Sequence, residues 1–245
     1  MSAYGPLARW YDALTEDVPY DALAAYYERL LDLGGHETLP VLDLCCGTGA
    51  LTNRMTRRGH EMIGVDRSPE MLAVAAEKAA AENFAVPPLY LCQDAAELDL
   101  YGTVAGAFSA LDSFNYLPPE DLAAALRRLR LFIEPGGRLA FDVQTPERLR
   151  ALDGGVFVDE TDEVLCLWRG EFDEAENALF YGMDIFRRSG GLWARETEEH
   201  TEYAHDPAAL AALLERSGFA DVRILRDGPM ADAGRIFLAA TNPGH

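Results

Sequence analysis

The chain has 245 residues, of which 49% are hydrophobic and 25% are charged, and its formal net charge is −20. This length and composition are those of a globular protein with a sizeable core, and one domain with an insertion is the simplest arrangement. The acidic balance argues against sequence-independent nucleic-acid binding, which requires a basic surface. No run of about 18 apolar residues is present, so we expect no membrane span. No basic and apolar leader is evident either, so we expect no signal peptide.

The four cysteines match no zinc-binding spacing, so we expect no metal site. Cys45 and Cys46 are adjacent, which makes them a poor disulfide pair. This cysteine usage suits a reducing cytoplasm, where we expect the protein to reside.

Residues 1–35 predict a helical arm. Aromatic and apolar side chains gather in the segment 4–16, which indicates a short helix or arm with an aromatic face. From Pro19 to Leu33 apolar side chains recur at helical spacing, and Gly34-Gly35 supplies a stop.

Residues 41–52 read as a strand, a glycine-bearing loop and the start of a helix, the opening of a nucleotide-binding βαβ unit. The glycines Gly47 and Gly49 let a ligand approach the backbone, and the helix N-terminus offers unpaired N–H groups. The dinucleotide fingerprint would need a third glycine, which is missing. Asp43, at the end of the strand, would repel a pyrophosphate and could hold an ammonium group.

The next two predicted strands also lead into acids. Residues 61–66 end at Asp66, which lies 23 residues beyond Asp43. This is close to the ~20-residue interval at which an acid meets a ribose in nucleotide-binding folds, and a carboxylate can accept from two adjacent hydroxyls. Ser68-Pro69 then begins a helix, and the strand 89–92 leads to Gln93-Asp94-Ala95.

The opening stretch resembles motif I of the class I S-adenosylmethionine-dependent methyltransferases, written D/E-x-G-x-G-x-G. Its acid and both glycines match, whereas Cys45 replaces the first glycine of the motif. Residues 64–72 resemble motif II, "GVDxSxxML". Residues 93–95 resemble motif III, in which an acid and the next backbone N–H contact the adenine edge. Tyr11-Asp12 resembles the "YD" of many members, where an N-terminal aromatic covers the cofactor; a core aromatic at the sheet edge explains it equally well.

This resemblance covers the whole chain and implies S-adenosyl-L-methionine as the cofactor and S-adenosyl-L-homocysteine as the product. It also implies a small-molecule acceptor, whose accepting atom the sequence leaves open. The cofactor-binding residues that it implies are Tyr11, Asp43, Cys45, Gly47, Asp66, Arg67, Met71, Gln93, Asp94, Ala95 and Ser109.

The central strand, 104–108, delivers the segment 109–117 to the ligand-binding end of the sheet. This segment resembles the family's "D-S-x-N-Y-L" and should face the transferring methyl group. Asp112 and Tyr116 are the candidates for a catalytic acceptor contact, although Asp112 could instead cap a turn. A helix to Phe132 and a strand over 139–143 follow.

The end of the chain predicts a helix from Asp206 to Gly218 and strands over 221–226 and 234–240. This order matches a seven-stranded methyltransferase sheet whose last strand is antiparallel. We therefore expect one α/β, Rossmann-like domain over 1–245, with helices on both faces. Strand-like patterns and a hairpin signal at Ser189-Gly190-Gly191 predict an antiparallel sheet inserted over 156–204.

The sequence thus favours a small-molecule methyltransferase, which must orient its substrates, exclude water and sometimes supply a base. We expect the inserted sheet to roof the acceptor pocket, with Tyr4, Tyr116 and His200 as substrate contacts. Arg195 and His200 differ in strand parity, so only one can face the pocket without a bulge. The inserted sheet could instead be a dimer surface, and the oligomeric state stays open.

Two other functions compete with methyl transfer. A non-catalytic protein that binds S-adenosylmethionine or a nucleoside would fit Cys45, whose side chain could crowd the methionine moiety. An NAD-dependent oxidoreductase is disfavoured by the missing third glycine.

Overall fold

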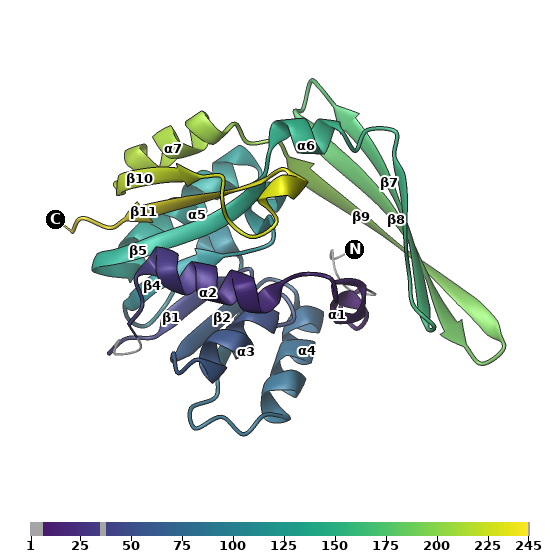
Figure 1. Cartoon of the computed structure of the whole chain (residues 1–245), viewed down its shortest axis with the longest axis horizontal. Helices are drawn as coiled ribbons and strands as arrows, with labels where there is room; N and C mark the ends of the chain where they lie inside the picture. Colours follow the sequence, from purple (N-terminus) through teal and green to yellow (C-terminus); the bar gives the residue numbers. More distant parts are fainter. Residues whose placement is uncertain (1–6, 35–37, 245) are drawn as a thin grey trace.

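The computed structural model describes residues 7–34 and 38–244, which two β-sheets organise (Figure 1). The larger sheet has seven strands in the order β10-β11-β5-β4-β1-β2-β3. In chain order they are β1 (Val41–Leu44), β2 (Met62–Asp66), β3 (Leu89–Cys92), β4 (Val104–Ser109), β5 (Ile133–Gln144), β10 (Ala220–Leu225) and β11 (Arg235–Thr241). The neighbouring strands β3, β2, β1, β4 and β5 pair in parallel, and β11 runs antiparallel to β5 and β10. The predicted sheet with an antiparallel last strand is confirmed.

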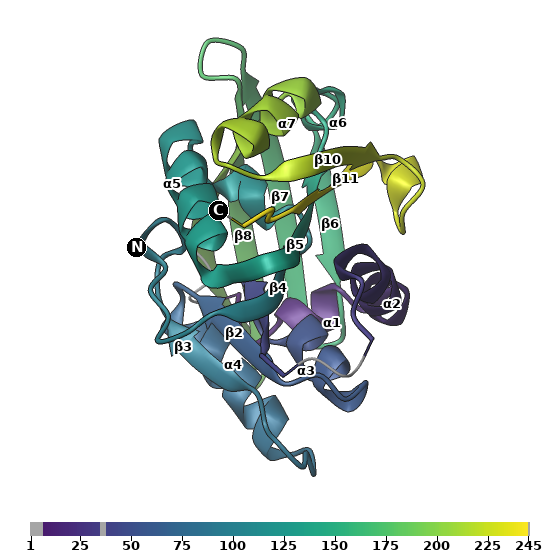
Figure 2. The ribbon, with the colours of Figure 1, turned by 90° about the vertical axis from the view of Figure 1, so that its left-hand side faces the viewer.

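Helices cover both faces of this sheet (Figures 1 and 2). They are α1 (Tyr11–Leu14), α2 (Tyr20–Leu31), α3 (Ala50–Arg57), α4 (Pro69–Ala80), α5 (Pro119–Phe132), α6 (Pro146–Arg150) and α7 (Pro207–Arg216), with 3-10 turns η1 (Ala95–Glu97), η2 (Ser113–Tyr116) and η3 (Ala231–Ala233). α5 and α7 pack on one face, and α2 and α3 on the other. No helix of the described residues is long and apolar enough to cross a membrane.

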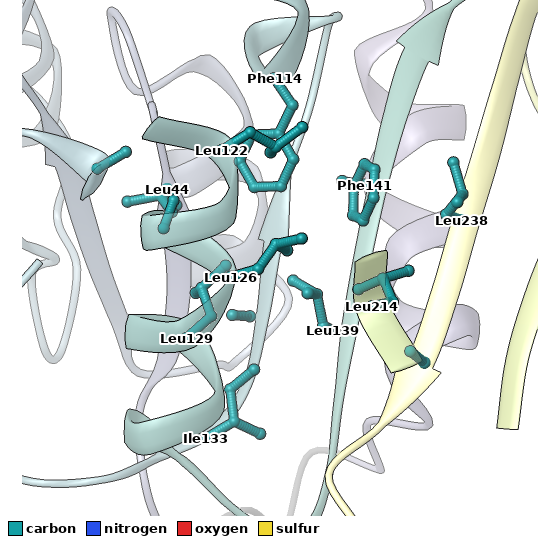
Figure 3. Packing of buried hydrophobic residues seen from close by; sticks show 14 of the residues in the cluster. Leu44, Phe114, Leu122, Leu126, Leu129, Ile133, Leu139, Phe141, Leu214 and Leu238 are labelled. Atoms are coloured by element: carbon teal, nitrogen blue, oxygen red, sulfur yellow. The ribbon is translucent and has the colours of Figure 1, made fainter. Parts of the chain in front are cut away.

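Strand β11 shows how the sequence builds two cores. Successive side chains of a strand point to opposite faces. Ile236 and Leu238 therefore join the cluster under α5 and α7, whereas Phe237 joins the cluster under α2. Figure 3 shows the first cluster, in which leucines of α5 lie toward Leu139 and Phe141 of β5. Burying each such side chain contributes roughly 1.5–3 kcal/mol to the stability of the fold, and this stability holds the strand ends in place.

The smaller sheet is antiparallel, with the order β6-β7-β8-β9. Its strands are β6 (Val156–Glu160), β7 (Val164–Asp173), β8 (Ala178–Ser189) and β9 (Leu192–Tyr203). The sequence predicted this inserted antiparallel sheet, although strand-like patterns marked only its three longer strands. The β8–β9 hairpin turns at Gly190, whose φ of 61° is easy for glycine. Figure 1 shows the hairpin extending away from the larger sheet.

The described start of the N-terminal arm, residues 7–14, lies between the two sheets (Figure 1). Leu7 is 1% exposed and packs on the inserted sheet against Val164, Met183 and other apolar side chains. Trp10 and Leu14, which flank and end α1, pack on the same cluster. One face of the inserted sheet is therefore buried against the arm.

Candidate active site

Three adjoining cavities lie where the strands of the larger sheet end. The first lies at the carboxyl ends of β1, β2 and β3. Nine of the eleven cofactor-binding residues expected from the sequence line it: Tyr11, Cys45, Gly47, Asp66, Arg67, Met71, Gln93, Asp94 and Ala95. Parallel strands bring their carboxyl ends to one edge, so acids distant in sequence meet there.

Asp66 ties the glycine loop to the end of β2. One carboxylate oxygen accepts from the backbone N–H of Gly47 at 2.8 Å, and the other accepts from that of Ser68 at 2.9 Å. Burial raises the pKa of Asp66, and these backbone hydrogen bonds oppose the shift. Each oxygen retains a second lone pair, so the carboxylate can also accept from a pair of hydroxyls.

The glycine loop has a backbone that brings a ligand close. Gly47 has a φ of 52° and open space where a Cβ would stand. Gly49 has a φ of 70°, and a Cβ there would lie 2.3 Å from the hydroxyl oxygen of Tyr90. Cys45 also has a positive φ, 61°, which is uncommon for a residue with a side chain. Burial raises the pKa of its thiol, which therefore stays protonated.

The other two expected cofactor-binding residues lie elsewhere. Asp43 lines a second, small cavity, where its carboxylate accepts from the Thr52 hydroxyl at 2.6 Å. Burial raises the pKa of Asp43 to about 7. Ser109 lines none of the three cavities: it is 1% exposed within the sheet, and its carbonyl accepts from the Tyr27 hydroxyl at 3.1 Å. The Ser109 side chain thus lies within the core, outside the walls of these cavities.

The third cavity, of about 360 Å³, lies between the two sheets. The larger sheet and the segment after β4 contribute Asp112, Tyr116, Gln144 and Arg235 to its wall, and the inserted sheet contributes Phe157, Asp159, Trp168, Tyr181 and Glu202. Tyr11 and Leu111 line all three cavities, and Tyr116 lines the first and the third. The three spaces therefore meet at the segment after β4.

A buried ion-pair network fixes this meeting point. Asp142, which is fully buried in β5, accepts from the backbone N–H groups of Leu111 and Asp112, each at 2.9 Å. It also accepts from the Tyr27 hydroxyl and the Arg235 guanidinium. Leu111 and Asp112 have φ values of 56° and 53°, an unusual backbone that these hydrogen bonds hold in place.

Of the two predicted catalytic candidates, Asp112 is already engaged by the protein. Its carboxylate pairs with Arg235 at 2.6 Å and accepts from the Gln144 side-chain amide at 3.2 Å. Tyr116 donates a hydrogen bond to the Glu202 carboxyl group, so it contacts an acid that the sequence did not single out.

The predicted substrate contacts on the inserted sheet are partly rearranged. His200 lies on the buried face, with Nε2 3.0 Å from a carboxylate oxygen of Glu198, but it is absent from the wall of the third cavity. Glu202, two residues along the same face, lines that cavity instead. Arg195 lies on the opposite face and binds Asp184 at 2.6 Å, as the parity argument requires. Tyr4 lies outside the described residues.

Two further anchors fix the arm beside the cavities. The Thr48 hydroxyl donates to Asp12 at 2.6 Å, and Lys78 of α4 forms an ion pair with the same carboxylate. The Leu7 N–H donates to Glu198 at 2.9 Å. The sequence missed Thr48, Lys78 and Glu198, because no motif or spacing marks a contact that only the folded arm creates. The described residues contain no cluster of three or more metal-ligating side chains.

Comparisons with known proteins place this geometry in a family. A family profile described as "Methyltransferase domain" matches residues 41–137. YqeM of Bacillus subtilis (strain 168), which is named as a methyltransferase, is 28% identical over 247 residues, covering 97% of this chain and 96% of that protein. A malonyl-acyl-carrier-protein O-methyltransferase of Serratia marcescens is 33% identical over 228 residues, covering 89% of this chain and 80% of that protein.

A solved structure shares the fold. The crystal structure of an S-adenosylmethionine-dependent methyltransferase from Clostridium acetobutylicum ATCC 824 matches with a TM-score of 0.83, at 24% identity, over 98% of this chain and 99% of that chain. The strand order, the ordered motifs and these relatives agree. The chain therefore belongs to the class I S-adenosylmethionine-dependent methyltransferases.

Proposed function

We propose that this methyltransferase holds S-adenosylmethionine across the first two cavities and its acceptor molecule in the third. The observation that carries this assignment is that Tyr11 and Leu111 line all three cavities. A methyl group bound at this junction would face the acceptor space without crossing the protein.

The residues of the first two cavities fit the cofactor. Asp66 offers free lone pairs to a ribose, and the open backbone at Gly47 admits a bulky ligand. Asp43 is a buried acid that suits the ammonium of the methionine end. When bound, S-adenosylmethionine supplies a methyl group on a reactive sulfonium. The protein then has to align the acceptor and exclude water, and Asp142 and Arg235 serve this alignment by fixing the segment after β4.

Cofactor binding can be tested by calorimetry with S-adenosylhomocysteine. We expect Asp66→Asn to weaken binding at least about tenfold, because a charged acceptor of two hydroxyl groups is lost. Asp99→Asn is the matched control, since the Asp99 carboxylate is exposed and pairs with Arg128. Thermal unfolding would establish that both variants fold. An unchanged affinity in folded Asp66→Asn would refute the ribose assignment.

A further inference from the structure

Glu202 is a buried acid whose hydrogen bonding is incomplete. It lies on β9, is 2% exposed and lines the third cavity. Tyr116 donates to its carboxyl group, yet Oε2 has no hydrogen-bond partner among the described residues. A buried oxygen left unpaired costs free energy, because it has lost its hydrogen bonds to water. A ligand that donates a hydrogen bond in this cavity would remove that cost.

The charges around the cavity favour a cation. Asp112, Asp159 and Glu202 line its wall, together with Arg148 and Arg235. The Arg235 charge is already shared between Asp112 and the neighbouring Asp142. Arg148 is the other positive side chain of the described wall; it is exposed, and its charge acts on Glu202. Even without Glu202, the three acids Asp112, Asp142 and Asp159 outnumber the two arginines, so an anionic acceptor such as a carboxylate would meet an excess of negative charge.

The remaining wall is aromatic. Tyr11, Tyr116, Phe157, Trp168 and Tyr181 all line the cavity. Aromatic faces attract cations through the negative charge of their π systems, and they cover apolar carbon. Burial raises the pKa values of Tyr11 and Tyr181, so these hydroxyls stay neutral and do not themselves act as bases.

From these contacts we infer that the acceptor is an amine, and that Glu202 binds its ammonium form and takes its proton. This inference rests on the proposed function, because it assigns the acceptor to the third cavity. Glu202 first gives up its own proton to solvent as the ammonium binds. The ammonium N–H bond then breaks, the proton moves to the Glu202 carboxylate, and the nitrogen regains its lone pair. That pair forms the new N–C bond to the methyl carbon while the C–S bond breaks and its electrons stay on sulfur. The product leaves as the methylated ammonium ion, and Glu202 is protonated again, as in the free site.

The burial of Glu202 supports this direction of proton transfer. Desolvation is the largest cause that raises the pKa of Glu202 well above its ordinary value, and the nearby Asp112 adds to it. In a buried site, a neutral acid beside a neutral amine is favoured over a separated pair of charges. An alcohol acceptor is too weakly acidic to lose its proton to a carboxylate, and a phenolate would add negative charge beside the acids.

Binding of simple amines to the protein loaded with S-adenosylhomocysteine tests the inference. The probes are 2-phenylethylamine and cyclohexylamine, each paired with the alcohol of the same carbon skeleton, and affinities are measured by calorimetry or ligand-observed NMR. We expect at least one amine to bind about tenfold more tightly than its alcohol. Glu202→Gln should abolish this preference. Glu199→Gln, the same substitution on the exposed, opposite face of β9, should keep it.

A second readout detects the proton itself. With a protonated Glu202 in the free site, ammonium binding near pH 7 should release up to one proton in the unsubstituted protein and in Glu199→Gln, but none in Glu202→Gln. Calorimetry in two buffers of different ionisation enthalpy measures this release. Amines that bind no better than alcohols, or a preference retained in folded Glu202→Gln, would overturn the inference. Failure to bind S-adenosylhomocysteine would instead overturn the proposed function, so that affinity is measured first.

Discussion

At the scale of single residues, Asp43, which we propose to bind the methionine ammonium, also affects stability. It is 2% exposed, and burial is the largest cause that raises its pKa to about 7. In an unfolded chain an aspartate titrates near pH 3.9. The folded chain therefore holds this proton more tightly than the unfolded chain. Stability from this group is complete below about pH 4 and is lost as the pH rises through 7.

Asp43→Asn should remove this titration. Relative to the variant, we expect the free energy of unfolding of the unsubstituted protein to fall by about 2–3 kcal/mol between pH 5 and pH 8. Urea unfolding at several pH values measures the difference. Thr52→Val keeps the carboxyl and removes the hydrogen bond that favours its ionised form, so it should keep the pH dependence. A difference between Asp43→Asn and the unsubstituted protein that stays constant with pH would contradict the expectation.

Some residues around the cavities could be predicted from the sequence, and others could not. Asp43 and Asp66 were predictable as neighbours, because acids that end parallel strands must meet at one edge. Arg235 and Glu202 were not, since nothing local marks them. Arg235 meets Asp142 across 93 residues of sequence, and Glu202 reaches the cavity only because the inserted sheet is laid against the body. Tertiary placement decides such contacts.

At the scale of elements, α1 depends on its surroundings. A helix of four residues has no independent stability. Its position comes from Asp12, which binds Thr48 and Lys78, and from the apolar side chains of the arm on the inserted sheet. Tyr11 is thereby held over all three cavities. The element can therefore control how fast a ligand leaves.

Asp12→Asn should speed the release of S-adenosylhomocysteine. The Asp12–Lys78 pair is partly exposed, so its loss together with a weakened Thr48 bond should raise the dissociation rate by about 2- to 10-fold. Stopped-flow displacement measures the rate. Asp17→Asn, at an exposed position just beyond α1, should leave it unchanged. Equal rates in folded Asp12→Asn and the unsubstituted protein would show that this contact does not hold the arm over the cofactor.

Element boundaries set by local residues were predicted more accurately than boundaries set by sheet pairing. Helix caps were read correctly at α4 and α7, where Ser68 and Asp206 accept from backbone N–H groups three residues on. Strand β5 begins at Ile133, well before the predicted Leu139, because its pairing with β4 continues through an irregularity. The turn residues still act locally, because the register shifts there and Gly136 has a φ of 87°, and pairing with β4 resumes at Arg138.

At the scale of the molecule, the inserted sheet supports the N-terminal arm as well as bounding the third cavity. Leu7 packs on its apolar face and donates to Glu198, while Trp168 and Glu202 line the cavity. The sequence predicted a roof over the acceptor, which would leave cofactor binding independent of the insertion. The packing of the arm changes that expectation.

Replacing residues 160–202 by a short Gly/Ser linker should therefore weaken S-adenosylhomocysteine binding by about tenfold or more and abolish methyl transfer, because the arm loses the surface that orders it. The seven-stranded body has its own two cores and should still unfold cooperatively. The matched control removes only the hairpin tip, 188–193, which carries the exposed Leu192 and Trp193 and lies outside the cavity walls described above. It should keep cofactor affinity.

Light scattering follows the mass of each variant, since an exposed sheet could also join two copies. Unchanged cofactor affinity after the full replacement, in a body that still folds, would show that the arm needs no support from the insertion. A halved mass in the tip variant would assign the hairpin to a dimer contact.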